Sequence, residues 1–153
     1  MQNSFLKDLL TDPTGLVIFN FAGREYCIDI KYVVAILNPN DESASSFSIN
    51  NENSTVKYQN ENIRIIDTAV IFGSKHISNK SSQRLFIILF KGNKMALPTE
   101  RISEIISLNK KIVDSLCYNP SKTNDYLSGS IEYEGRTIYV LDLNEIIELE
   151  KGL

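Results

Sequence analysis

Residues Val56–Phe72 read VKYQNENIRIIDTAVIF, and residues Ile131–Ile147 read IEYEGRTIYVLDLNEII. These two stretches are copies of one pattern that align at a constant offset, with Asp67 on Asp142, and they carry the strongest indication of the fold. Each copy predicts a hairpin whose second strand ends at the aspartate and is followed by a short apolar helical turn. An aspartate there can accept hydrogen bonds from the free backbone N–H groups of the turn. Both aspartates are therefore interpreted as helix N-caps rather than as catalytic acids.

A second repeated pair precedes these copies. Residues Val17–Ile36 (VIFNFAGREYCIDIKYVVAI) match residues Phe86–Ile105 (FIILFKGNKMALPTERISEI), again at a constant offset, with Gly23 on Gly92. Each copy predicts an apolar strand, a tight turn, a second strand and a short segment with apolar i, i+3 spacing. Glycine suits the turn because hairpin turns need positive φ, which a residue without a Cβ atom adopts at little cost.

The order of the repeats predicts two similar halves with about five short strands each. Many short strands separated by turn signals favour small barrels over an open parallel sheet, and closing a barrel hides its sheet edges. We therefore predict an all-β fold with a few short helices, built from two five-stranded barrels related by internal duplication. The first subdomain is expected at about residues 15–73, a linker at 74–84 and the second subdomain at about 85–149.

Two polar segments interrupt the repeats. Asn38–Thr55 (NPNDESASSFSINNENST) is long for a loop in a small domain, which is typical of a functional or mobile loop. Ser74–Gln83 (SKHISNKSSQ) joins the two halves and contains the only histidine, His76. Because no Cys, Asp or Glu lies at ligand spacing from it, His76 is interpreted as a solvated linker residue rather than as a metal ligand.

The composition argues against several classes of function. The chain has 153 residues, 42% of them hydrophobic, and a net charge of −3 with scattered basic residues, which does not favour a nucleic-acid partner. Its apolar runs are far shorter than the ~20 residues of a membrane-spanning helix. Residues Met1–Thr11 lack the pattern of a signal peptide, and their apolar spacing predicts a short amphipathic turn. We expect a cytoplasmic protein with no direct insertion into a membrane.

The sequence offers no persuasive catalytic, cofactor or metal site. Its seven glycines form no phosphate-binding or dinucleotide-binding motif. With its one histidine in a linker, no Ser/His/Asp or Cys/His set is convincing. Cys27 and Cys117 form no disulfide framework, and Cys27, like Met95 and Leu97, is interpreted as a core residue. We expect no enzyme activity, no cofactor and no metal.

The repeated segments also resemble a known family. Tyr126–Ile147 has an aromatic-Leu-x-Gly pattern, a hairpin glycine and an Ile-x-x-Leu-Asp pattern, and it is similar to the signature of the CheW family. Gly92–Ile105 and Leu16–Ile36 resemble two further parts of that pattern, in the same order along the chain. The resemblance implies SH3-like five-stranded barrels, no catalytic activity, and a scaffold that couples chemoreceptors to a CheA-type histidine kinase.

The partners that the resemblance implies are the regulatory domain of the kinase and the cytoplasmic tip of the receptor, with recruitment to membrane receptor arrays. The chain departs from the family where an Asn-Leu-Arg-Gly stretch is typical, since it has KYQN at Lys57–Asn60. An acidic residue of the family is replaced by Ala35, although its duplicate Glu104 is retained. The candidate contact residues are Ile36, Leu37, Tyr58, Gln59, Asn60 and Arg64. For Ile36, a place in the barrel core is an equal alternative.

Three functions remain open from the sequence. The first is a chemosensory coupling adaptor. The second is an adaptor of the same fold whose altered residues 38–64 contact a partner other than a chemoreceptor. The third is a small-ligand-binding barrel or an enzyme that uses the groove between the halves.

Overall fold

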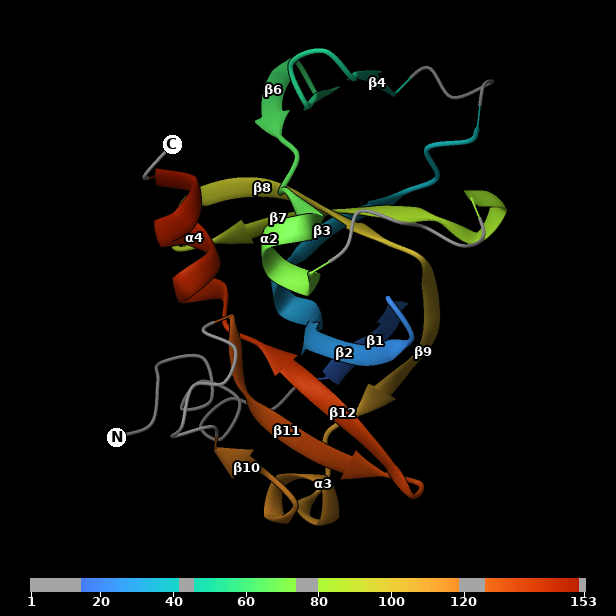
Figure 1. Ribbon diagram of the computed structural model, residues 1–153, viewed down its shortest axis with the longest axis vertical. Coiled ribbons are helices and arrows are strands. Elements are labelled where there is room, and N and C mark those ends of the chain that lie inside the picture. The colour runs from blue at the N-terminus through green and yellow to red at the C-terminus, as the bar shows by residue number, and fades with distance from the viewer. Residues whose placement is uncertain (1–14, 42–45, 74–79, 119–125, 152–153) are drawn as a thin grey trace.

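The computed structural model of the chain describes residues 15–41, 46–73, 80–118 and 126–151 (Figure 1). The first half contains β1 (Gly15–Phe21), β2 (Arg24–Asp29), η1 (Ile30–Tyr32), β3 (Val33–Leu37), β4 (Phe47–Asn50), β5 (Thr55–Tyr58), β6 (Glu61–Arg64) and α2 (Thr68–Phe72). The second half contains η2 (Lys80–Ser82), β7 (Arg84–Phe90), β8 (Asn93–Thr99), β9 (Arg101–Ser107), α3 (Lys110–Asp114), β10 (Cys117–Tyr118), β11 (Leu127–Tyr133), β12 (Arg136–Leu141) and α4 (Leu143–Lys151). The amphipathic turn expected in Met1–Thr11 and the linker residue His76 lie outside the described residues.

Among the described residues the strands form three sheets, with the orders β10-β11-β12-β2-β1-β9, β3-β7-β8 and β4-β5-β6. The predicted all-β class with short helices is confirmed. The sheets do not, however, close into the two five-stranded barrels that the sequence predicted. Within the described ranges β10 and β9 remain edge strands of the first sheet, and the backbone ladder between the two small sheets is reduced to one parallel bridge, Ile65↔Ala96, between the end of β6 and β8.

Strands from the two halves of the sequence share sheets. The β1–β2 hairpin pairs with β9 on one side and with β12 on the other, and β3 pairs with β7. Residues on both sides of the segment 74–84 therefore contribute to two of the three sheets. The positions of the subdomain boundaries at 15–73 and 85–149 stay a prediction.

The contacts between the two halves join positions that are equivalent in the alignment of the repeats. The parallel pair Val140↔Cys27 joins β12 to β2, and the parallel bridge Ile65↔Ala96 joins the end of β6 to β8. In the repeats Val140 is the counterpart of Ile65, and Cys27 is the counterpart of Ala96. The first hairpin of each half thus lies against the second hairpin of the other half, in the same register. The duplication seen in the sequence is therefore also a duplication of tertiary pairing.

The hairpin turns follow the repeats as well. Each of the four places two consecutive residues at positive φ, which is the geometry of a type I′ turn: Ala22–Gly23, Gln59–Asn60, Lys91–Gly92 and Glu134–Gly135. Three of them carry glycine at the second position. In the β5–β6 turn that position is Asn60 at a φ of 62°, and asparagine is among the non-glycine residues that best tolerate this region.

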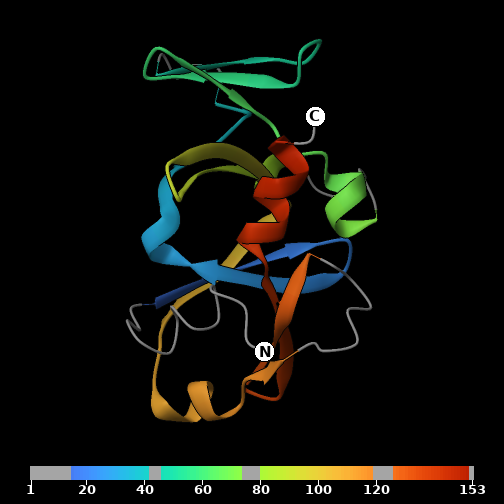
Figure 2. The same ribbon diagram turned by 90° about the vertical axis from the view of Figure 1, so that its left-hand side faces the viewer.

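The two repeated aspartates cap helices, as predicted. Asp67 Oδ1 accepts a hydrogen bond from the Ala69 N–H at 3.0 Å, at the start of α2. Asp142 Oδ1 accepts one from the Glu145 N–H at 3.2 Å, at the start of α4. Figures 1 and 2 show both helices in the middle of the molecule, between the β4–β5–β6 sheet at one end and β10–β12 at the other.

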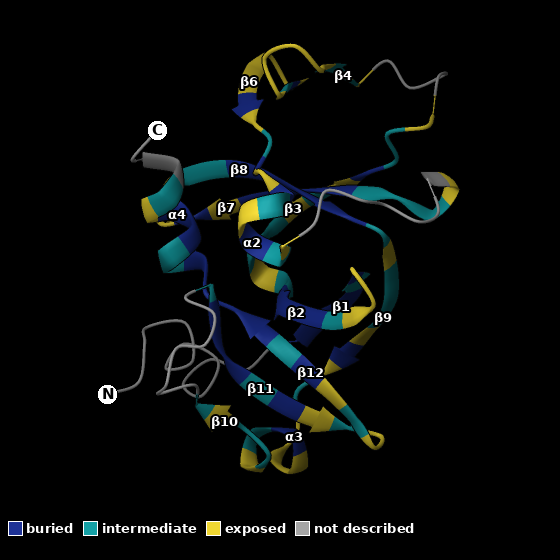
Figure 3. Ribbon diagram, viewed as in Figure 1, coloured by how far each residue is buried: buried dark blue, intermediate teal, exposed yellow. Residues whose placement is uncertain are grey.

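The main core lies where the halves meet. It joins β1, β2, β7, β8, β11, β12 and both helices, and its buried residues appear dark blue in Figure 3. The Phe72 ring of α2 stacks on Phe21 with ring centroids 4.5 Å apart and lies 4.7 Å from Tyr26. Cys27 and Met95 are buried here, as is Leu97, which confirms their predicted place in the core.

A second, smaller core lies beneath the β4–β5–β6 sheet. Its buried members are Leu37, Val56, Ile63, Leu85, Ile87 and Ala96. Phe47 and Ile49 of β4 pack against it, because alternate residues of a strand point to the same face. This strand lies inside Asn38–Thr55, so the expectation of a long loop is wrong for residues 47–50.

A second difference concerns the segments that follow the first hairpin of each half. The sequence spacing predicted a helical turn at Val33–Leu37, but this segment is strand β3, and its counterpart is strand β9. Branched side chains such as Val33, Val34 and Ile36 favour strands, and β7 provides a backbone ladder for them. Pairing with a distant strand has overridden a local spacing pattern.

Candidate partner-binding surface

The six candidate contact residues lie in three places. Ile36 and Leu37 end β3, Tyr58 to Asn60 form the β5–β6 turn, and Arg64 ends β6. The turn and Arg64 lie at opposite ends of β6, because Tyr58 pairs with Glu61 whereas Arg64 pairs with Thr55. The structure therefore does not bring the six residues into one patch.

Ile36 and Leu37 point to opposite sides of β3. Leu37 is 7% exposed and belongs to the smaller core, which gives it a packing role. Ile36 is 39% exposed, so the alternative that placed it in the barrel core is wrong. Val34, two residues earlier on the same face, is 48% exposed. Together they give the edge strand β3 an exposed apolar face, and a contact role for Ile36 stays a prediction.

The β5–β6 turn borders a shallow hollow of about 220 Å³. Its lining residues are Ser46, Phe47, Ser48, Lys57, Gln59 and Asn60. Tyr58 is half-buried against the smaller core, and its hydroxyl accepts a hydrogen bond from Gln59 Nε2 at 3.4 Å. The turn therefore presents amide groups next to an ammonium group, where the family pattern would present arginine and glycine.

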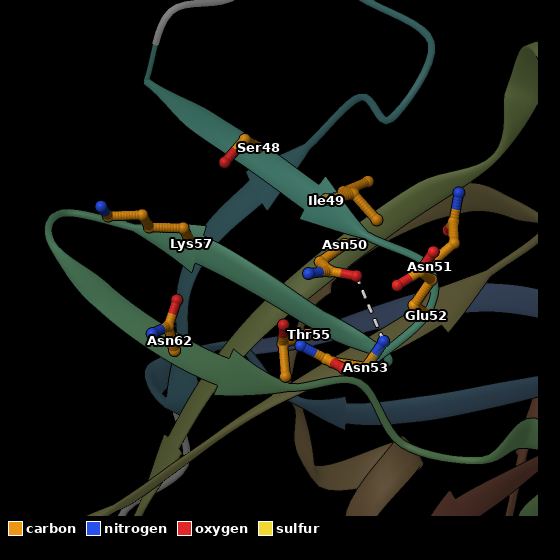
Figure 4. Close-up of a pocket in the computed structure, with 9 residues that line it drawn as sticks. All are labelled: Ser48, Ile49, Asn50, Asn51, Glu52, Asn53, Thr55, Lys57 and Asn62. Carbon is orange, nitrogen blue, oxygen red and sulfur yellow. Dashed lines mark hydrogen bonds between the residues drawn. The ribbon is translucent and has the colours of Figure 1, made fainter.

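The outer face of the β4–β5–β6 sheet is polar and was missed from the sequence. Ser48, Asn50, Thr55, Lys57 and Asn62 line an open hollow of about 680 Å³ on it, bordered by the β4–β5 connection (Figure 4). The signal was present in Phe47–Asn50, where apolar and polar residues alternate. It was overlooked because the surrounding run of Asn and Ser residues is typical of a loop.

Two ion pairs of Arg136 join β12 to β2 and to β9, away from the β4–β5–β6 sheet. Arg136 Nη1 lies 2.9 Å from Glu25 Oε2, and Arg136 Nη2 lies 2.6 Å from Glu104 Oε1. The hydrogen bond to Glu104 raises the pKa of the Arg136 guanidinium above its ordinary value, so this group stays charged. The acidic residue that the second half retains is thus engaged within its own sheet.

The described residues offer little for covalent or metal chemistry. Burial raises the pKa of the Cys27 thiol, and the nearby Asp29 charge adds to this, so the thiol stays protonated. Cys117 is exposed and forms no disulfide with Cys27. In the described ranges, no three His, Cys, Asp or Glu side chains gather where they could hold a metal ion. No helix within those ranges is long and apolar enough to cross a membrane.

Comparison with known proteins identifies both a family and a structural relative. A family model described as CheW-like domain matches residues 15–151. The crystal structure of the scaffolding protein TtCheW from Thermoanaerobacter tengcongensis matches with a TM-score of 0.68 and 21% sequence identity, over 88% of this chain and 87% of that chain. At 21% sequence identity the structural match is evidence for the fold alone. No curated protein sequence matches the chain.

Proposed function

Because the chain belongs to the CheW-like domain family, we propose that it is a non-catalytic adaptor that couples chemoreceptors to a CheA-type histidine kinase in the cytoplasm. The observation that carries the proposal is the family match, which spans residues 15–151 and so includes every strand described. TtCheW is a scaffolding protein, which agrees with the proposal.

Two surfaces support an adaptor role physically. Among the described residues β3 is an edge strand, and its exposed apolar face with Val34 and Ile36 suits contact with another β-rich domain. The regulatory domain of the kinase is the partner that we assign to it. The β5–β6 turn with Gln59 and Asn60 offers amide groups that can hydrogen-bond to a receptor helix.

The direct test is a calorimetric titration of the protein with the regulatory domain of the CheA-type kinase from its host. We expect saturable binding near one to one. The substitution Ile36→Glu should weaken it by about tenfold or more, because it places a charge in an apolar contact. Val70→Glu changes an equally exposed valine on α2 and is the matched control. Absence of binding by the unmodified protein would overturn the proposal.

A second candidate is an adaptor of the same fold with a partner other than a chemoreceptor. It is favoured by the β5–β6 turn, where Gln59 and Asn60 replace the Arg and Gly of the family pattern. Restoring the Asn-Leu-Arg-Gly pattern with Lys57→Asn, Tyr58→Leu, Gln59→Arg and Asn60→Gly should then create receptor binding that the unmodified protein lacks. If the unmodified protein already supports receptor-dependent kinase activation, this candidate is wrong.

A further inference from the structure

Two ion pairs join hairpins that come from different halves of the chain. Glu25 of β2 pairs with Arg136 of β12, with Oε2 and Nη1 2.9 Å apart. Glu61 of β6 pairs with Lys94 of β8, with Oε1 and Nζ 2.7 Å apart. Both pairs lie close to the parallel contacts through which one half pairs with the other.

The four charged residues occupy equivalent positions of the repeats. The alignment of the first hairpins that places Gly23 on Gly92 also places Glu25 on Lys94. The alignment of the second hairpins, which matches their two capping aspartates, places Glu61 on Arg136. At both positions the duplicated residue has the opposite charge. Both hairpins of the first half therefore carry an acid, and both hairpins of the second half carry a base.

This distribution separates two arrangements that the repeats would otherwise allow. In the observed arrangement each hairpin lies against a hairpin of the other half, and both contacts join an acid to a base. If each half instead paired its own two hairpins, the same positions would bring Glu25 against Glu61 and Lys94 against Arg136. Two attractions would become two repulsions.

Apolar packing distinguishes the two arrangements less sharply than charge does, because several of the repeated core positions carry similar residues. Phe21 corresponds to Phe90, and Val56 and Ile63 correspond to Ile131 and Ile138, all of them buried. A hairpin could exchange its apolar contacts with little loss. Like charges at contact positions are the usual means by which proteins exclude a competing pairing.

We propose that these four residues form a charge code that selects the arrangement in which hairpins are exchanged between the halves. The interface between hairpins accepts a hairpin of opposite charge and rejects one of like charge. Glu104, which also binds Arg136, lies on β9, and β9 pairs with β1 of the hairpin that carries Glu25, so Glu104 adds to the negative charge that Arg136 meets there.

The code acts on the choice of partner more than on stability. Glu61 and Arg136 are 53% and 36% exposed, and their partners Lys94 and Glu25 are 29% and 19% exposed, so both pairs are partly solvated and each is weak. The choice between two arrangements, however, depends on the sum of two attractions and two repulsions. During refolding it is made between hairpins with nearly equal apolar faces, where a small difference decides.

The test is the double substitution Glu61→Lys with Lys94→Glu. It keeps both ion pairs of the native arrangement and the net charge of the chain. It also makes the competing arrangement attractive, because Glu25 could then face the new lysine at position 61 and Arg136 the new glutamate at position 94. The charges then no longer distinguish the two arrangements, although both native ion pairs remain.

The measurement is refolding from denaturant, followed by carbodiimide coupling of adjacent carboxylates and amines and mass spectrometry. In the variant we expect about a tenfold rise in the fraction of chains that refold slowly or not at all, from four weak charge contacts taken together. A link between Glu25 and position 61 should appear beside the native link between positions 61 and 94. The control is Lys110→Asp with Asp114→Lys, which reverses an exposed pair within α3.

Two further measurements complete the test: refolding at high salt and refolding of a neutral variant. In about 1 M salt, where the Debye length is ~3 Å, the unmodified protein should refold as poorly as the variant. The neutral variant Glu61→Gln with Lys94→Gln should fall between them, and it carries the comparison if the reversed variant yields no native protein. Refolding of these variants at the rate and yield of the unmodified protein, with no link between Glu25 and position 61, would overturn the proposal.

Discussion

Gly129 lies in β11 opposite Tyr118 of β10. A Cβ atom at this position would lie 2.1 Å from the carbonyl oxygen of Cys117. The obstacle is backbone, so it cannot move aside as a flexible side chain would. The glycine of the aromatic-Leu-x-Gly pattern is therefore required by the close approach of a neighbouring strand.

The first prediction follows from this contact. Gly129→Ala should lower the free energy of unfolding by roughly 2–4 kcal/mol, because β10 must separate from β11 to admit the methyl group. Urea denaturation measures the change. The control is Gly135→Asn in the β11–β12 turn, where nothing lies within 4 Å of an added Cβ and where the equivalent position is Asn60. That change should cost well under about 1 kcal/mol, and equal losses in both variants would contradict the steric explanation.

Cys27 is fully buried in the main core, and burial raises the pKa of its thiol. In the unfolded chain the thiol ionises near its ordinary value of 9.0. The folded state therefore keeps a proton that the unfolded state releases. The contribution of Cys27 to stability is fully present below pH 9.0 and is lost as the pH rises above that value.

The second prediction is a difference in pH dependence. Between pH 9 and 10 the free energy of unfolding should fall more steeply for the unmodified protein than for Cys27→Ala, by up to ~1.4 kcal/mol per pH unit. Other groups also titrate there, so the quantity to compare is the difference between the two slopes. In the native protein at lower pH, a thiol reagent should label Cys117 and not Cys27. Equal slopes would show that the buried thiol does not remain protonated.

The residues that could be predicted from the sequence are those whose roles are local. Asp67 and Asp142 act on N–H groups two and three residues further along the chain, so their capping role followed from spacing alone. The exposure of Ile36 could not be predicted, because it depends on β3 being an edge strand beside β7. The partner of Glu104 likewise lies on a strand 32 residues away.

At the scale of elements, the β4–β5–β6 sheet is the least supported part of the fold. It meets the rest of the molecule through the bridge Ile65↔Ala96, the hydrogen bond from the Ile66 N–H to the Ala96 carbonyl, the exposed pair of Lys94 with Glu61 and the smaller core. The duplicate of its β5–β6 hairpin, β11–β12, continues into β2 and the main sheet. The β5–β6 and β11–β12 hairpins are equivalent in the repeats, but β5–β6 is held by fewer interactions with the rest of the molecule.

The third prediction is that amide hydrogens of β5–β6 exchange faster than those of β11–β12. Val56 pairs with Ile63, and Ile131 pairs with Ile138 at the equivalent place, so each amide has a matched counterpart. Local opening of the small sheet should make its exchange faster by roughly tenfold to a hundredfold. Protection factors from hydrogen exchange measure this. Equal protection in both hairpins would mean that the small sheet opens only with the whole molecule.

The elements also divide into those that could and could not be predicted. Hairpins with strong turn signals followed from the sequence, because Gly23, Gly92 and Gly135 mark turns with positive φ. Strand β4 did not, because only Phe47 and Ile49 carry its pattern within a run of polar residues. A four-residue strand is stabilised by the sheet that it joins, and its own propensity is too weak to reveal it.

At the scale of the whole molecule, the repeats indicated two equivalent halves but not which hairpins would pair. The apolar pattern is the same at equivalent positions, so periodicity cannot distinguish pairing within a half from pairing between halves. The charges at Glu25, Glu61, Lys94 and Arg136 do distinguish them, but only when they are compared across both alignments. The ladders of β1 with β9, β2 with β12 and β3 with β7 all join residues from different halves.

The fourth prediction concerns fragments produced by cutting the chain between residues 79 and 80. Neither fragment should fold cooperatively alone, because each loses the strands that pair with its first hairpin and its share of the main core. Mixed in equal amounts, the fragments should restore the strand signal in circular dichroism and elute together from a sizing column. The uncut protein is the reference.

The same experiment distinguishes two descriptions of the molecule. If each half were an independent subdomain, each fragment would show its own cooperative unfolding transition and mixing would change neither. With hairpins exchanged, the apolar surface of Phe21, Cys27 and Phe86 stays exposed in a lone fragment and gives no stable core. Association of the fragments should then weaken as salt rises if charge pairs guide it, because apolar contact alone does not weaken with ionic strength. The dependence of fragment association on salt therefore separates the contribution of the charges from that of the core.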